Sequence, residues 1–220
     1  MCKGRTLAER SVAGLHAFLV RYLPNILTYN SAILDVGCGT GAWLDRLYHL
    51  GYRNLYGIDA DIGQFETNKA KILRLNLDFE INVGGGQKFK LITAIEVIEH
   101  LENPGYFFRN IQKLLDEDGY LLMTTPNVYS LACRLRFFVL SDLKQFGEVG
   151  DPTHIYPVFL SNMERILRRY RLEIAAKWGY PANGRTLSSR RLINILCSSL
   201  RLILPEEIPG DVLCLLIRKS

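Results

Sequence analysis

The chain is poor in the residues that build disulfide or metal-cluster scaffolds. It has five cysteines among 220 residues, which is an odd number, and no two of them form a Cys-x-x-Cys pair. They are Cys2, Cys38, Cys133, Cys197 and Cys214. We therefore expect neither a disulfide framework nor a zinc cluster, and the cysteine usage indicates a reducing compartment such as the cytoplasm.

Long apolar runs and long basic blocks are also missing. The most apolar stretch, residues 192–204, contains Arg201 and is too short to cross a bilayer. The N-terminus is polar, unlike the apolar core of a secretion signal. The net charge of +5 is mild, with no basic block interleaved with aromatic residues, so nucleic acid is not expected as a partner. A hydrophobic content of 48% indicates a globular chain, which we expect to form one domain over residues 1–220.

Apolar runs and helical periodicity alternate along the first 126 residues. The expected strands are residues 31–36, 55–58, 72–75, 91–95, 120–125, 172–178 and 211–218. The expected helices are residues 7–23, 41–50, 63–71, 104–115, 128–140, 160–170 and 186–203, with a turn at 116–119. This alternation predicts right-handed βαβ units in an α/β fold.

The predicted fold is a Rossmann-like, seven-stranded, mostly parallel sheet with helices on both faces. The last two strands are expected to form an antiparallel edge. Two segments outside the alternating pattern, residues 128–158 and 180–209, are predicted to be insertions that cap a site.

A glycine-rich turn follows the first predicted strand. Gly37, Gly39 and Gly41 stand at alternate positions, and glycine lets the backbone approach a ligand without hindrance from Cβ. The spacing differs from the Gly-x-Gly-x-x-Gly of dinucleotide sites and indicates S-adenosylmethionine instead of NAD. Asp59 follows Gly39 by 20 residues, the separation of a carboxylate that accepts ribose hydroxyls. The alternatives are a turn without ligand and, for Asp59, a helix N-cap.

Four motifs together resemble the class I S-adenosylmethionine-dependent methyltransferases. They are Asp-Val-Gly-Cys-Gly-Thr-Gly at 35–41, Gly-Ile-Asp at 57–59, Ile-Glu-Val-Ile-Glu-His at 95–100 and Gly-Tyr-Leu-Leu-Met-Thr-Thr-Pro-Asn at 119–127. The resemblance covers residues 12–218 and is nearest to small-molecule and quinone O-methyltransferases. It implies S-adenosylmethionine as cofactor and S-adenosylhomocysteine as product.

The same resemblance implies which residues bind the cofactor. They are Asp35, Gly37, Cys38, Gly39, Gly41, Asp59, Ala60, Asn76, Leu77 and Glu96. Gly37, Cys38 and Gly39 would line the methionine part, Asp35 would orient its amino group, and Asp59 would bind the ribose. The loop after the third strand would hold the adenine, through Asn76 or, as second choice, Asp78.

Glu96, Glu99 and His100 follow the fourth predicted strand and are neighbours on one helical turn. With the distant His154 they make two carboxylates and two imidazoles, a set that suits a divalent cation. A similar set occurs in quinone-ring O-methyltransferases and small-RNA 2′-O-methyltransferases. We favour a metal-free role in which His100 or His154, with Glu99, acts as a base or orients the substrate. A structural role for Glu96 and His100 is the third alternative.

Methyl transfer displaces an activated sulfonium, so the enzyme chiefly positions the nucleophile. A histidine base favours a hydroxyl nucleophile. We therefore predict O-methylation of a small molecule or of a glycan or lipid-linked acceptor. The alternatives are an RNA 2′-O-methyltransferase and a non-catalytic S-adenosylmethionine-binding protein. The arginines of the two insertions belong either to ordinary amphipathic helices or to a lid with peripheral membrane contact. His16 is predicted to be a surface residue, with a place over the cofactor as the alternative.

Overall fold

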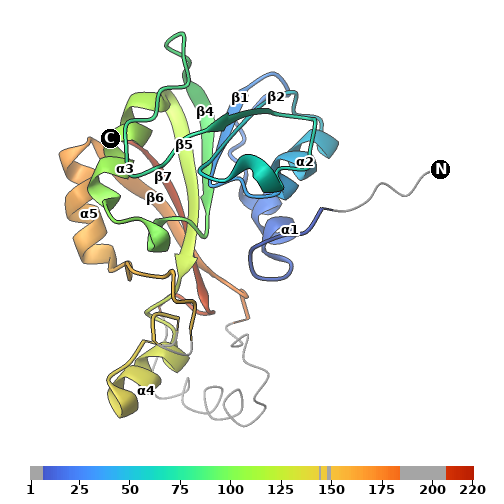
Figure 1. Cartoon of the computed structure of the whole chain (residues 1–220). Coiled ribbons are helices and arrows are strands. Elements are labelled where there is room, and N and C mark those ends of the chain that lie inside the picture. The colour runs from blue at the N-terminus through green and yellow to red at the C-terminus, as the bar shows by residue number, and fades with distance from the viewer. Residues whose placement is uncertain (1–6, 144, 148–149, 184–206) are drawn as a thin grey trace.

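The computed structural model describes residues 7–143, 145–147, 150–183 and 207–220 (Figure 1). Its strands are β1 (Ala32–Val36), β2 (Asn54–Asp59), β3 (Lys71–Arg74), β4 (Phe89–Ile95), β5 (Leu115–Pro126), β6 (Leu172–Tyr180) and β7 (Val212–Lys219). Its α-helices are α1 (Leu15–Leu19), α2 (Ala42–His49), α3 (Pro104–Leu114), α4 (Leu131–Leu140) and α5 (Leu160–Arg169). Short 3₁₀ turns cover Val20–Tyr22, Ile62–Gln64 and Ile98–His100.

The seven strands form one sheet in the order β3-β2-β1-β4-β5-β7-β6. Strands β1 to β5 pair in parallel, and β7 runs antiparallel to both β5 and β6. The predicted Rossmann-like fold is therefore confirmed, with β6 at the edge and the antiparallel strand β7 one place inside it. The direction in which successive strands are added to the sheet reverses between β1 and β4. In such sheets, ligands bind at the carboxyl ends of the two strands that flank this reversal.

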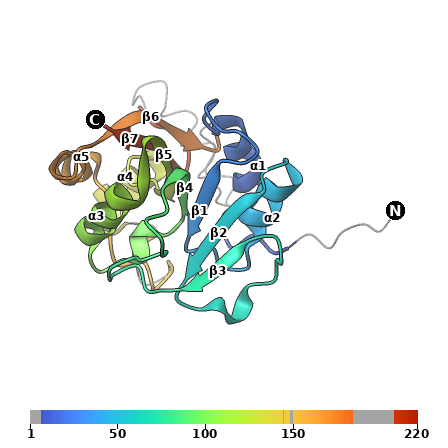
Figure 2. The same ribbon diagram turned by 90° about the horizontal axis from the view of Figure 1, so that it is seen from above.

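Helices cover both faces of the sheet (Figure 2). Alternate residues of β1 face opposite sides: Leu34 belongs to the core shared with α3 and α5, and Ile33 to the core shared with α1 and α2. Large side chains fill each layer, such as Phe107 on one side and Trp43 on the other. Each such side chain contributes about 1.5–3 kcal/mol by burial, so the two cores hold the carboxyl ends of β1 and β4 in place.

Two of the predicted helices are replaced by other structure. The helix expected at 7–23 begins only at Leu15, because Gly14 has a left-handed φ of 80° and the preceding residues run along the glycine loop. The helix expected at 63–71 is one 3₁₀ turn followed by extended chain. There the backbone N–H of Glu66 donates to the Thr40 carbonyl instead of closing a helical bond.

The remaining described elements follow the prediction, with boundaries shifted by a few residues, as in α4, which begins at Leu131 instead of residue 128. Strand β5 begins at Leu115, so the turn expected at 116–119 is part of an irregular strand whose register with β4 shifts between Phe89 and Leu91. The helix expected at 186–203 lies outside the described residues. None of the helices in the described ranges has the length and apolar character that a membrane span needs.

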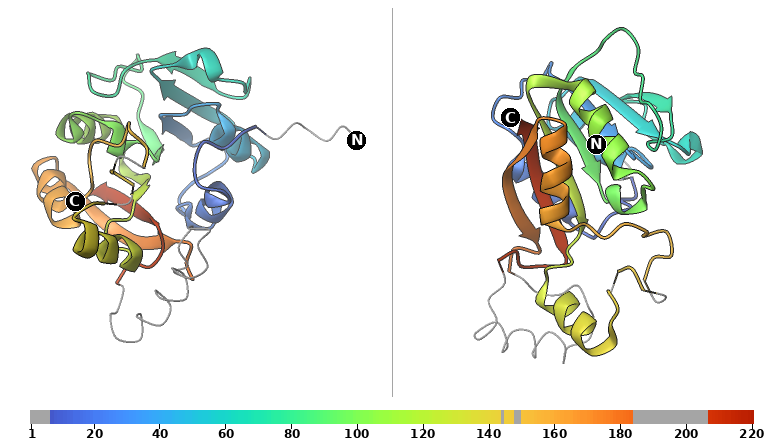
Figure 3. Two further views of the ribbon diagram at one scale, coloured as in Figure 1. Left: turned by 60° about the horizontal axis from the view of Figure 1, so that its bottom comes forward. Right: turned by 90° about the vertical axis from the view of Figure 1, so that its left-hand side faces the viewer.

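The first predicted insertion has two parts. Helix α4 lies beyond the carboxyl end of β5, away from the helical layers on the two faces (Figures 1 and 3). The chain after it returns to the sheet, where the backbone N–H groups of Ile155 and Tyr156 donate to the Glu99 carbonyl at 2.8 and 3.0 Å. Within the described part of this insertion, the residues that line the cavity described next are Asp151 and Thr153 of the returning chain. Of the second insertion, residues 184–206 are outside the described chain.

Candidate functional site

A cavity of about 560 Å³ opens at the carboxyl ends of β1, β2 and β4. Ten residues named from the sequence lie on its wall: Asp35, Gly37, Cys38, Gly39, Asp59, Ala60, Asn76, Leu77, Glu96 and His100. Three others, Gly41, Glu99 and His154, do not line it. Residues from four separate segments therefore meet at one surface, as expected for this edge of a doubly wound sheet.

The glycine loop is tied to the end of β2. The backbone N–H groups of Gly37 and Cys38 both donate to the carbonyl of Ile58, at 2.8 and 3.1 Å. Gly37 has a φ of 71°, and a Cβ there would lie 2.6 Å from the Val97 side chain. Only glycine satisfies both conditions, so the backbone itself forms this part of the wall.

Gly41 has a different environment from the other two glycines. It is the N-cap of α2 with a φ of 82°, and a Cβ there would meet Thr67 at 2.5 Å and Phe65 at 2.8 Å. Its role in this structure is to let the segment after β2 pack against the loop. The structure therefore places Gly41 behind the predicted cofactor surface.

Asp59 is held by two backbone donors. Its Oδ2 accepts from Gly39 N at 2.8 Å, and its Oδ1 accepts from Asp61 N at 2.9 Å. Each carboxylate oxygen has a second lone pair, so the group can still accept the two hydroxyls of a ribose. The contact with Gly39 joins the two motifs that the sequence places 20 residues apart.

Asp35 is buried, with 3% of its surface exposed, and its Oδ1 accepts a 2.6 Å hydrogen bond from the Thr93 hydroxyl. Burial raises the pKa of Asp35 to about 7; the Thr93 hydrogen bond lowers this pKa, and the nearby Asp59 raises it. A cation placed beside Asp35 would favour its ionised form. The group is therefore suited to the amino group of the methionine part.

The loop after β3 is fixed by its own side chains. Asn76 Oδ1 accepts from Asp78 N at 2.9 Å, and Asp78 Oδ1 accepts from Asn103 N at 3.0 Å. Asn103 is the N-cap of α3, so the loop is anchored to the helix on that face. Asn76, Leu77 and Asp78 all line the cavity, where they can meet an adenine ring.

The N-terminal segment contributes wall residues that sequence reasoning missed, namely Arg10 and Ser11. His16 joins them, and with 6% of its surface exposed it is not the surface residue that was predicted. Burial lowers the pKa of His16 to about 4, partly opposed by Glu9. No motif marks these residues, because their position depends on a loop that folds back over β1.

Within the described chain, three buried polar atoms at this end of the cavity have no hydrogen-bond partner. They are Ser11 Oγ, His16 Nδ1 and Trp43 Nε1. His16 packs edge-on against Trp43, with ring centroids 5.4 Å apart. Unpaired buried polar groups are costly, so their arrangement on a cavity wall fits a polar ligand.

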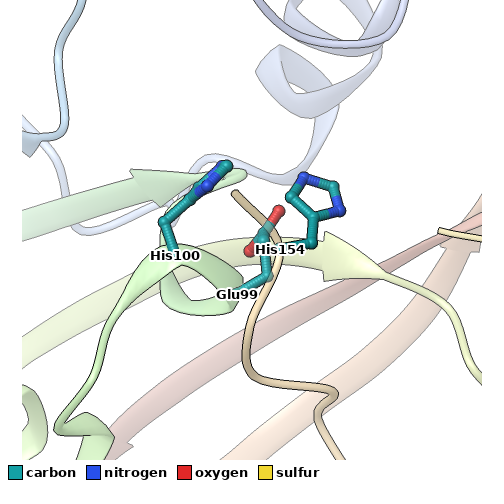
Figure 4. A group of neighbouring side chains, drawn as sticks. All are labelled: Glu99, His100 and His154. Atoms are coloured by element: carbon teal, nitrogen blue, oxygen red, sulfur yellow. The ribbon is translucent and has the colours of Figure 1, made fainter. Parts of the chain in front are cut away.

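Glu99, His100 and His154 gather beside the cavity (Figure 4). One ligand atom from each lies within 4.8 Å of the others, and the two imidazole centroids are 4.7 Å apart. Glu96 is not part of this group. Its Oε1 accepts from the Thr124 hydroxyl at 2.9 Å, and its φ of 56° directs the chain away from β4. The predicted set of four is therefore a set of three here.

Glu99 is a fully buried carboxyl group. Among the described residues, neither carboxylate oxygen makes a hydrogen bond of ordinary geometry, although Thr125 is near. Burial, and then the neighbouring Glu96, raise the pKa of Glu99 well above its usual range. Such a group is neutralised either by a proton or by a cation bound next to it.

Both histidines have one ring nitrogen occupied by a backbone carbonyl. His154 Nδ1 lies 3.1 Å from the Gln145 oxygen, and His100 Nδ1 lies 3.2 Å from the Thr153 oxygen. A carbonyl only accepts, so each Nδ1 carries a proton, and in the neutral imidazole the Nε2 keeps its lone pair. This is the arrangement of imidazoles that ligate a metal. With the unpaired Glu99, the three residues fit a divalent cation.

Among the described residues of the cavity wall, carboxyl groups outnumber cationic side chains. The acidic residues are Asp35, Asp59, Asp78, Glu96 and Asp151, against Arg10. S-adenosylmethionine carries a sulfonium and an ammonium against one carboxylate, so an acidic wall with a single arginine matches its charges.

Residues 8–177 match the model of a methyltransferase domain family. The chain is 31% identical over 104 residues to a ubiquinone biosynthesis O-methyltransferase of Pelagibacter ubique, covering 44% of this chain and 43% of that protein. It is 32% identical over 139 residues to one from Rickettsia conorii, covering 60% and 47%. It therefore spans about half the length of these relatives. The crystal structure of an S-adenosylmethionine-dependent methyltransferase from Archaeoglobus fulgidus has the same fold, with a TM-score of 0.63, 18% identity and 93% of both chains covered.

Proposed function

Because the chain belongs to the class I S-adenosylmethionine-dependent methyltransferase family, we propose that it transfers the methyl group of S-adenosylmethionine to a hydroxyl oxygen of a small molecule. One observation carries the hydroxyl assignment: the buried Glu99, whose carboxylate has no hydrogen-bond partner among the described residues, lies with two imidazoles beside the cavity. An amine is nucleophilic without help, whereas a hydroxyl needs its proton removed.

The cavity supports a defined orientation of the cofactor. Asp59 would accept the ribose hydroxyls, Asp35 the amino group, and the loop of Asn76 and Leu77 the adenine. The methionine carboxylate would meet Arg10 and the unpaired Ser11 hydroxyl. In this orientation the sulfonium methyl is directed along the wall towards Glu96 and His100, where an acceptor would be held in line for displacement.

Glu99, His100 and His154 would hold a divalent cation in this enzyme. When bound, such a cation lowers the pKa of a coordinated hydroxyl and orients it. Glu99 would bring the negative charge, and the two histidines would bring neutral ligands at Nε2. Burial and the neighbouring His100 lower the pKa of His154, which keeps its imidazole neutral. His100 is the one member of the three that lines the cavity, so it lies nearest to the acceptor.

The acceptor class follows from the charge of the wall and from the curated relatives. Carboxyl groups outnumber cationic side chains on the described wall, so the described cavity is suited to a small acceptor and not to a polyanion such as RNA. The relatives are named as O-methyltransferases of ubiquinone biosynthesis. We propose phenolic hydroxyls as the first acceptors to test, with sugar and lipid-linked hydroxyls next.

The test combines cofactor binding with turnover. Calorimetry with S-adenosylhomocysteine is expected to show saturable binding, and its absence at millimolar concentration would rule out the methyltransferase assignment. Methyl transfer to a panel of phenols, alcohols and sugars is then measured with MgCl₂ or with EDTA.

Glu99→Gln is the informative variant, because it keeps the shape of the side chain and removes the charge. It should bind S-adenosylhomocysteine normally and lose about 100-fold in turnover, by the size of a single catalytic group. Unchanged turnover in this variant and in EDTA would show that the cluster does not activate the acceptor.

A further inference from the structure

The segment that carries His154 also carries a second group of polar residues. Its position is set by the Glu99 carbonyl, which accepts from Ile155 N at 2.8 Å and from Tyr156 N at 3.0 Å. Asp151 and Thr153 lie at the start of this segment, and both line the cavity. They were not among the residues that the sequence singled out as a site.

These residues form a chain of hydrogen bonds that ends on His100. The Thr153 hydroxyl lies 2.6 Å from Asp151 Oδ1 and 2.9 Å from His100 Nδ1. The Asp151 carboxylate can only accept, so the Thr153 hydroxyl donates to it. The hydroxyl oxygen then has a lone pair for the proton on His100 Nδ1.

A second contact also shows that His100 Nδ1 is a hydrogen-bond donor. The Thr153 backbone oxygen lies 3.2 Å from His100 Nδ1, and it too can only accept. The Asp151 side chain is held in place by the backbone, because its Oδ1 also accepts from Thr153 N at 2.9 Å. The order of donors is therefore His100 to Thr153 to Asp151, and His100 Nε2 is left with its lone pair.

We propose that Thr153 and Asp151 are positioning residues that fix His100 as the Nδ1–H tautomer and strengthen its Nε2 as a ligand. This inference rests on the proposed function, because it gives the cluster of Glu99, His100 and His154 its orientation. A negative charge behind the N–H of a ligating imidazole raises the electron density at the other nitrogen and holds the ring at one angle. His154 Nδ1 faces the Gln145 carbonyl, and its Nε2 lies 3.9 Å from Asp151 Oδ2, so we expect the two histidines to differ.

The test uses the full chain and two measurements that do not depend on turnover. The ¹⁵N shifts of His100, assigned by their loss in His100→Gln, report its tautomer in metal-free protein. Titration with MnCl₂ followed by electron paramagnetic resonance reports cation affinity. The variants are Thr153→Val, which removes the hydroxyl at nearly constant shape, Thr153→Ser, which restores it, and Asp151→Asn, which removes the charge alone.

We expect wild-type His100 to be the Nδ1–H tautomer. Thr153→Val should weaken Mn²⁺ binding about tenfold and populate the other tautomer, and Asp151→Asn should weaken binding by a smaller factor. Thr153→Ser should resemble the wild type. Asp142→Asn is the matched control, because Asp142 lies in the same insertion, pairs with Arg136 and does not line the cavity. Asp142→Asn should leave the affinity for S-adenosylhomocysteine at the wild-type value, because Asp142 does not line the cavity.

A wild-type His100 in the Nε2–H form would overturn the proposal, and so would a Thr153→Val variant that matches wild type in both measurements. If the wild type binds no Mn²⁺ at millimolar concentration, the cation part of the proposed function fails. The ¹⁵N shifts of Thr153→Val against Thr153→Ser would then decide the positioning role separately.

Discussion

Asp35 and Asp59 are two carboxyl groups on one cavity wall, but their surroundings differ. Asp59 accepts hydrogen bonds from two backbone N–H groups. Asp35 has one hydroxyl donor, and its burial raises its pKa to about 7. The charge of Asp35 therefore depends on pH and on whether a cation lies beside it.

The first prediction concerns cofactor affinity. Affinity for S-adenosylhomocysteine should rise as pH increases through about 7, because the ionised form of Asp35 binds the amino group. Asp35→Asn should lose about tenfold or more in affinity at pH 8, by the size of a charged hydrogen bond, and should show little of this pH dependence. Calorimetry at pH 6, 7 and 8 measures both. Equal pH dependence in wild type and variant would assign the effect to another group.

The second prediction concerns stability of the free protein. The folded pKa of Asp35, about 7, is above its ordinary value of 3.8, so the folded state holds the proton more tightly. The resulting stabilisation is present at low pH and is lost as pH rises towards 7. Between pH 5 and pH 8 the free energy of unfolding should fall by about 1–3 kcal/mol more in wild type than in Asp35→Asn. Urea denaturation at the two pH values measures the difference; parallel curves would contradict it.

The glycine loop and helix α2, which follows it, form one structural unit with two roles. Gly37 and Gly39 bring bare backbone to the cavity, and Gly41 lets Phe65 and Thr67 pack behind it. The segment that follows β2 does not continue as a helix, because the Glu66 N–H donates to the Thr40 carbonyl of the loop. The helical propensity of residues 63–71 was thus overridden by a tertiary contact with the neighbouring glycine turn.

The loop can be tested with two glycines of nearly the same conformation. Gly41 has a φ of 82° and Gly84 a φ of 79°, but a Cβ on Gly84 would meet nothing within 4 Å. Both alanine variants should lose about 1 kcal/mol for the left-handed backbone. Gly41→Ala should lose a further 1–3 kcal/mol, roughly, for the clash with Phe65 and Thr67. Chemical denaturation compares the two, and equal losses would show that the packing adapts.

The N-terminal segment connects distant parts of the molecule over the cofactor cavity. Thr40 donates to the Ala8 carbonyl at 2.8 Å, Arg46 pairs with Glu9 at 2.7 Å, and the Tyr180 hydroxyl donates to the Ala13 carbonyl at 2.7 Å. The segment places Arg10 and Ser11 on the wall between these anchors. The contacts that anchor this segment should therefore influence the rate at which the cofactor dissociates.

Tyr180→Phe tests this by removing one hydroxyl at the edge of the sheet. Loss of one hydrogen bond of about 1 kcal/mol should speed S-adenosylhomocysteine release a few-fold and leave the fold intact. Stopped-flow displacement measures the rate. Tyr29→Phe is the control, because Tyr29 is 67% exposed and distant from the cavity wall. Equal release rates in the two variants would mean that this anchor does not control the cavity.

The local sequence was sufficient to predict the parallel sheet and part of the proposed cofactor site. The Gly37 turn and Asp59 could be predicted because both directly follow buried strands whose carboxyl ends must meet at one edge of a doubly wound sheet. Arg10 and Ser11 could not be predicted, because they reach the wall through a non-helical segment stabilised by partners far along the chain. The same holds for the strained φ of Glu96, which depends on Thr124 in the adjacent strand.

The sequence by itself determined the order of the seven strands, the glycine turn after β1 and the acidic residue at the end of β2. These depend on periodicity, on glycine and on neighbouring strand ends, which are all short-range properties. Only the tertiary structure decided that Glu99 is buried without a partner and that His154 lies beside it. It also decided that Thr153 fixes the tautomer of His100. Burial and hydrogen-bond direction depend on groups that are 50 residues or more apart in the chain, and only the folded packing of the insertion against Glu99 brings them together.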